Sequence, residues 1–75
     1  MKNDAVQDFL TERWNEFRHA IKERWPDITD NELDVINGQS DVLVGTLQEH
    51  YWISKAEAEK QLRDFVEEFL GEPAL

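Results

Sequence analysis

Of the residue types that commonly carry out chemistry in proteins, this chain of 75 residues lacks cysteine and has only two histidines, and no set of such residues has the spacing of a known site. The chain has no cysteine, which excludes a thiol nucleophile. Its two histidines are His19 and His50, and neither has a second histidine or a carboxylate at a spacing typical of a metal site. A metal ion needs three or four converging ligands. We therefore interpret both histidines as solvated surface residues.

Carboxylates are abundant, but their pairing follows from composition. With 17 acidic residues in the chain, neighbours such as Glu67 and Glu68, or Asp30 and Glu32, arise by chance. Proton transfer by a carboxyl group also needs a pocket that raises its pKa, and a core this small seldom encloses one. No glycine-rich loop has the spacing that cradles a phosphate. We predict no enzymatic activity, no catalytic, cofactor-binding or metal-binding residue, and no cofactor.

The residues before Pro26 are predicted to form one amphipathic helix of about five turns. Its apolar positions lie mostly three or four residues apart, as on one face of a helix: Val6, Phe9, Leu10, Trp14, Phe17, Ile21 and Trp25. Asn3 or Asp4 can cap its start, and Pro26 ends it because the residue before a proline avoids the helical region. Both tryptophans on this stripe are predicted to lie in the core.

A short second helix is predicted between Thr29 and Gly38. Thr29 and Glu32 have the spacing of a capping box, in which each side chain bonds a backbone N–H of the other residue. Ile28 and Leu33 match the hydrophobic staple across the same turn. Gly38 ends the helix because glycine takes the left-handed conformation without steric cost.

A third helix is predicted from Ser40, as its cap, to Tyr51. Gly45 lies inside it, where glycine costs about 1 kcal/mol relative to alanine. We therefore predict that another helix approaches closely at Gly45 and offsets this loss.

The fourth predicted helix begins at Ser54 and ends before Gly71. Ser54 and Glu57 have the spacing of a second capping box. We interpret Thr29 and Ser54 as structural caps and not as phosphoacceptor or catalytic hydroxyls. The apolar residues of this helix follow the helical period: Ala58, Leu62, Phe65, Val66, Phe69 and Leu70.

The length and composition predict a single helical domain over residues 1–75. No apolar run approaches the roughly 18 residues that span a bilayer, and the polar N-terminus does not resemble a signal peptide. The absence of cysteine fits a reducing cytoplasm. We expect a soluble, cytoplasmic monomer.

The net charge of −9 is concentrated in the middle of the chain, where residues 25–54 carry no Lys or Arg. Such a surface repels phosphate backbones and anionic lipid headgroups, so we expect no membrane binding and a disadvantage for nucleic acid. Two interpretations stay open: a solubilising surface, which composition alone explains, and a docking patch for a basic protein. In a compact bundle its carboxylates would form one acidic face: Asp27, Asp30, Glu32, Asp34, Asp41 and Glu49.

Residues spread over most of the chain resemble the CsbD-like family of small bacterial stress-response proteins. They are Trp14, Phe17, Trp25, Ile28-Thr29-Asp30, Leu33-Asp34-Val35-Ile36, Gly38, Asp41, Leu43-Val44-Gly45, Leu47-Gln48-Glu49, Tyr51 and Ser54-Lys55-x-Glu57-Ala58-Glu59. The resemblance implies an all-α fold, a small four-helix bundle of two orthogonally packed helical hairpins. It also implies expression under general stress and no established enzymatic activity.

The chain departs from the family pattern at several turns. Pro26 and Trp52 stand where members commonly have glycine, and the basic residues usual near Gln39 and Ser40 are missing. Proline and a non-glycine residue can both occupy turns, so we expect the fold to be kept. Properties that depend on those basic groups are not expected here.

Two functional classes follow from these observations. The first is a non-enzymatic stress-response protein that acts through its surface, either by binding a partner or as a stable, acidic solute. The second is a nucleic-acid-associated module, because the junction at Gly38 resembles a helix-turn-helix. Such a module needs a basic recognition face, and residues 40–51 contain no Lys or Arg, so we favour the first class.

Overall fold

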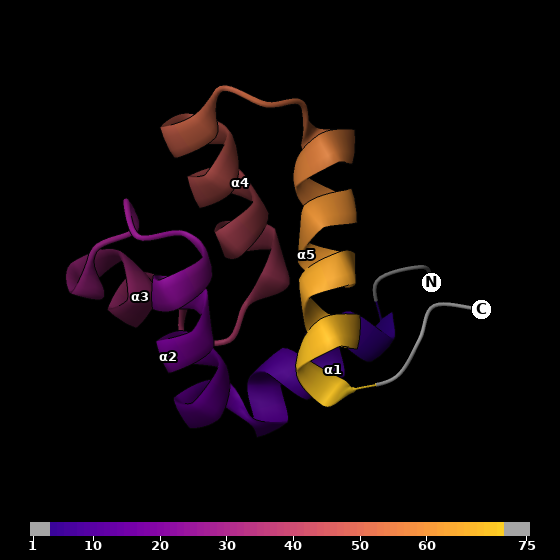
Figure 1. The fold of residues 1–75 in the computed structure, drawn as a ribbon. Helices are drawn as coiled ribbons and strands as arrows, with labels where there is room; N and C mark the ends of the chain where they lie inside the picture. The colour runs from indigo at the N-terminus through magenta and orange to yellow at the C-terminus, as the bar shows by residue number, and fades with distance from the viewer. Residues whose placement is uncertain (1–3, 72–75) are drawn as a thin grey trace.

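The computed structural model describes residues 4–71, which form five helices and, within that range, no strand. The all-α prediction is therefore confirmed. The helices are α1 (Asp4–Glu12), α2 (Trp14–Arg24), α3 (Asp30–Ile36), α4 (Ser40–Tyr51) and α5 (Lys55–Leu70), as Figure 1 shows. The predicted cap at Asn3 lies outside the described residues, and Asp4 lies within α1.

The prediction of a single first helix is wrong, because the chain turns at Arg13 between α1 and α2. Arg13 has φ −120° and ψ 33°, outside the helical region. Leu10 and Trp14, on either side of the turn, are both buried, so the apolar stripe continues through it. Because of this turn, α1 runs past α4 and contacts it. As predicted, α2 ends before Pro26.

The core gathers apolar side chains from all five helices. Trp14 and Trp25 are buried, which confirms that both are core residues. The ring of Phe17 lies 6.0 Å from that of Phe65 and 4.3 Å from that of Phe69, measured between centroids. Aromatic packing thus joins α2 to α5 in a chain that has no disulfide.

The capping box at the start of α3 is complete. The Glu32 backbone N–H donates to Thr29 Oγ1 at 3.1 Å, and the Thr29 N–H donates to Glu32 Oε1 at 2.9 Å. The helix ends where predicted, with Asn37 (φ 46°) and then Gly38 (φ 85°) in the left-handed region. Both local signals read from the sequence are confirmed here.

The start of α4 differs from the prediction that Ser40 is its cap. The capping position is Gln39, whose side chain makes no capping hydrogen bond. Instead Gln7, from α1, accepts at its Oε1 from the Ser40 backbone N–H at 2.8 Å and from Ser40 Oγ at 2.9 Å. A side chain from another helix therefore satisfies an N–H group that a local cap would otherwise satisfy.

Helices α4 and α5 are packed together and lie side by side in Figure 1. Ser54 caps α5 as predicted, because its Oγ accepts from the Glu57 N–H at 3.0 Å. The Glu57 carboxylate accepts from Gln61 Nε2, so only the first half of the predicted box is formed. Trp52 closes α4 in the left-handed region (φ 57°) although it is not glycine. The orthogonal packing of two hairpins stays a prediction.

Candidate functional site

The residues considered first for chemistry do not converge. Within residues 4–71 there is no cluster of three or more His, Asp or Glu side chains that could hold a metal ion. Asp30 and Glu32 lie on the same short helix but bind different partners, so they do not act as a pair of carboxylates. His19 is exposed, as predicted.

The prediction that His50 is a solvated surface residue is wrong. Its Nε2 lies 2.8 Å from both carboxylate oxygens of Glu32, and its side chain is only 27% exposed. The two residues are 18 positions apart and come from α3 and the last turn of α4. No local spacing in the sequence could have indicated this contact.

Glu32 is the centre of a small polar cluster. Its carboxylate accepts from the Thr29 backbone N–H and from Thr29 Oγ1, and it also contacts His50. The Thr29 backbone hydrogen bond, followed by the hydrogen bond to His50, lowers the pKa of Glu32. The cluster therefore joins the start of α3 to the end of α4 with an ionised carboxylate.

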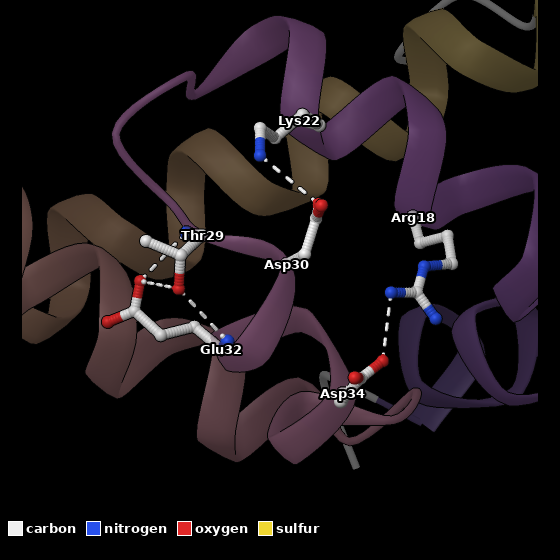
Figure 2. Close-up of polar contacts among 6 residues, drawn as sticks. All are labelled: Arg18, Lys22, Thr29, Asp30, Glu32 and Asp34. Atoms are coloured by element: carbon white, nitrogen blue, oxygen red, sulfur yellow. Dashed lines mark hydrogen bonds and ion pairs between the residues drawn. The ribbon is translucent and has the colours of Figure 1, made fainter.

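The predicted acidic face is partly neutralised by α2. Lys22 Nζ lies 3.1 Å from Asp30 Oδ1, and Arg18 Nη2 lies 2.9 Å from Asp34 Oδ1. Figure 2 shows both cations reaching from α2 to the same side of α3, while Glu32 turns towards Thr29. The middle of the sequence is purely anionic, but its folded surface is not.

Three other carboxylates of that middle segment form no ion pair with any residue in the range 4–71: Asp27, Asp41 and Glu49. Asp41 and Glu49 are exposed and lie on α4. The uncompensated negative charge of the central segment is therefore found mainly along α4.

The predicted close approach of a helix at Gly45 is wrong. A Cβ atom added to Gly45 would meet nothing within 4 Å. Gly45 instead lies on the surface of α4, between two shallow hollows of about 390 Å³ each. The hollow on the α3 side is lined by Gly45 with Glu32, Val35, Val42, Thr46 and Glu49. The hollow on the α5 side is lined by Gly45 with Asp41, Val44, Gln48, Lys55 and Glu59. We call the two hollows together the Gly45 groove.

The glycine that another helix approaches closely is Gly38. A Cβ atom added there would lie 3.3 Å from the Leu10 carbonyl oxygen and 3.3 Å from Thr11 Cα, both on α1. The Gly38 carbonyl also accepts from Gln7 Nε2 at 2.7 Å. The sequence shows glycine at both positions and cannot tell which one faces a neighbouring helix.

Three large apolar side chains are exposed in the described part of the chain: Val35, Trp52 and Phe69. Phe69 packs on Phe17 and is 37% exposed, whereas Trp52 is 92% exposed and follows the end of α4. Val35 is 70% exposed and borders the Gly45 groove. The groove thus combines exposed apolar surface with carboxylates, which suits recognition of a partner that is both apolar and cationic.

None of the helices in residues 4–71 has the length and apolar content that crossing a membrane would require. The ion pairs between α2 and α3, and the carboxylates of α4 that are unpaired within that range, lie at the surface of the bundle.

Several curated bacterial proteins are similar to this chain over most of its length. The UPF0337 protein PA4738 of Pseudomonas aeruginosa is 45% identical over 58 residues, which cover 77% of this chain and 89% of the relative. The UPF0337 protein pc0632 of Protochlamydia amoebophila is 41% identical over 59 residues, which cover 79% and 89%. The UPF0337 protein YjbJ of Escherichia coli K12 is 40% identical over 52 residues, which cover 69% and 75%. No family model and no solved structure matches the chain.

Proposed function

Because this chain belongs to the UPF0337 family, which is the CsbD-like family, we propose that it is a non-enzymatic stress-response protein that acts by binding through its surface. The names of the relatives describe no activity or partner. The stress-response role follows from the family resemblance. We place the protein in the cytoplasm, as the absence of cysteine suggests.

One observation supports binding over a purely solubilising role. Gly45 lies inside α4, where glycine is unfavourable, and no internal contact explains it. A protein that served only as a stable, acidic solute would gain from alanine at this position. A half-buried glycine with open space at its Cβ position, between two hollows that carry apolar and acidic residues, fits a surface that another molecule contacts.

The proposal is tested by survival of its bacterial host under stress. We expect a strain lacking the protein to survive heat, salt or ethanol stress less well, and the wild-type protein to restore survival. Normal survival of the deletion strain under all three stresses would overturn the stress-response role. A substrate converted by the purified protein would overturn the non-enzymatic part.

Two matched variants separate binding from solubilising charge. One carries Glu49→Lys and Glu59→Lys, at the Gly45 groove, and the other carries Glu67→Lys and Glu68→Lys, on the last turns of α5. Both change the net charge by the same amount, and none of the four carboxylates forms an ion pair within residues 4–71. Binding predicts that only the first variant fails to restore survival, whereas a solubilising role predicts that both behave alike.

A further inference from the structure

Gly45 is explained by neither of the usual roles of a glycine within the fold. Its φ is not positive, so the backbone does not need glycine. No other helix packs closely on it, because an added Cβ atom would meet nothing within 4 Å. Glycine in such a position lowers helix stability, yet it lets another backbone approach closely. A molecule that reaches α4 from outside would make use of that approach.

The surface around Gly45 is a shallow depression lined by residues of three helices, α3, α4 and α5. Val35, from α3, and Val42, from α4, line the hollow on one side, and Val44 lines the hollow on the other side, which is shared with α5. The Thr46 hydroxyl donates to the Val42 carbonyl at 2.9 Å, so it adds no unpaired donor to this surface. Val35 is 70% exposed whereas Val44 is 6% exposed, so apolar contact is available mainly on the α3 side of Gly45.

The charges around the groove select a cationic occupant. Asp41, Glu49 and Glu59 form no ion pair within the described chain, and Glu32 is held by Thr29 and His50. One lysine, Lys55, lines the groove. A second copy of this chain would bring another net charge of −9 to the same surface, which opposes self-association.

From these observations we propose that the Gly45 groove binds a basic amphipathic helix of another protein. Small apolar residues of that helix would lie on Gly45 and Val35, and its Lys or Arg side chains would contact Asp41, Glu49 and Glu59. A helical ligand suits a groove between packed helices. A ligand in extended conformation would need a sheet edge, and residues 4–71 contain no strand. This inference rests on the proposed function, because it names the partner for surface binding.

The probe for the test is a synthetic helical peptide of about 18 residues, with Ala and Leu on one face and Lys and Arg on the other. It is titrated into the full-length, ¹⁵N-labelled protein at low salt, and amide shifts are followed by NMR. We expect saturable binding, with the largest shifts at Val35, Val42, Gly45 and Thr46. The affinity should fall as salt is added.

Gly45→Leu fills the Gly45 groove and should abolish saturable binding, since the leucine side chain would occupy the open space next to α4. Asn15→Leu is the control, because it adds the same side chain at an exposed position of α2. The amide spectra and urea midpoints of both variants establish that they fold. Wild-type affinity in Gly45→Leu would overturn the inference.

Charge-reversal variants distinguish binding at the Gly45 groove from general attraction of the cationic peptide to an acidic protein. Glu49→Lys with Glu59→Lys should weaken binding about tenfold, whereas Glu67→Lys with Glu68→Lys should change it about twofold at most. Equal losses in the two double variants would overturn the inference, because they would show attraction to net charge alone. Sedimentation of the free protein as a dimer that Gly45→Leu dissociates would overturn it in favour of a second copy.

The outcomes also separate this inference from the proposed function. If the peptide does not bind, the proposal that the Gly45 groove binds a basic helix is overturned. The outcome of the survival test does not depend on that result. A deletion strain that survives normally removes the stress-response role, while binding of the peptide at Gly45 would still support the groove.

Discussion

Gly38 lies just before α4 and Gly45 lies in the middle of it, and their surroundings are opposite. Gly38 is buried with φ +85°, and an added Cβ atom would lie 3.3 Å from backbone atoms of α1. Gly45 is half-buried, has ordinary helical backbone, and has open space where a Cβ atom would be. The fold requires glycine at the first position and not at the second.

The region around Gly38 is held together by contacts that span much of the chain. Gln7 bonds both the Gly38 carbonyl and the Ser40 backbone N–H, so α1 is fixed to the turn between α3 and α4. No comparable contact surrounds Gly45 on its outer side. The first region stabilises the fold, whereas the second gives up some stability and leaves a surface open, which is common at functional positions.

Gly38→Ala is expected to have the largest effect. Left-handed strain and overpacking against α1 should together lower the free energy of unfolding by about 2–4 kcal/mol. Gly71→Ala is the matched control, because Gly71 has φ +75° and open space around it, so it tests the strain alone. We expect a loss of about 1 kcal/mol there, measured by urea unfolding. Equal losses in the two variants would show that α1 does not press on Gly38.

Gln7→Ala should have the next largest effect. It removes the partner of the Ser40 N–H and of the buried Ser40 hydroxyl. We expect a loss of about 1–3 kcal/mol, because these groups are left without a hydrogen bond. Gln48→Ala, at a half-buried position of α4, is the control and should change stability little. A small effect of Gln7→Ala would mean that α1 is not fixed to this turn by its side chain.

The stability that the capping box at the start of α3 contributes is expected to depend on pH, because the Glu32 carboxyl group titrates. The hydrogen bond from the Thr29 N–H and the contact with His50 lower the pKa of this carboxyl in the folded state. Its contribution is therefore present above the unfolded carboxyl pKa and is lost as the pH falls through the lower, folded pKa. Glu32→Ala should lose about 1 kcal/mol near neutral pH and less in acid.

The measurement is the difference in urea midpoint between Glu32→Ala and the wild type across the acid range. Asp27→Ala, an exposed carboxylate without an ion pair in residues 4–71, should show no such trend. A difference that stays constant down to low pH would contradict the role of the ionised Glu32.

Features that depend on neighbouring residues could be predicted from the sequence. The caps at Thr29 and Ser54 and the end of α3 at Gly38 each follow from residues within one turn. The burial of Trp14 and Trp25 follows from helical spacing, because the buried face of a helix can be recognised from the spacing of the apolar residues of that helix alone.

Features that depend on distant residues could not be predicted. The turn at Arg13 lies within an unbroken apolar stripe, and in the fold it accompanies contacts of Gln7 with Gly38 and Ser40, which are 31 and 33 positions away. The same holds for His50 and Glu32, which are 18 positions apart. The Gly45 groove could not be predicted for a related reason. A glycine in a helix predicts that something comes close, but only the fold shows that this is not another part of the same chain.

Gly45→Ala tests the central claim most directly, although its expected effect is the smallest. If Gly45 faces outward with open space around it, alanine should raise the free energy of unfolding by up to about 1 kcal/mol, because the helix gains stability and nothing is displaced. Urea unfolding of this variant and the wild type, under identical conditions, measures the difference. A higher midpoint is the predicted result. A lower midpoint would contradict the account, because it would show that the interior of the protein needs glycine at this position.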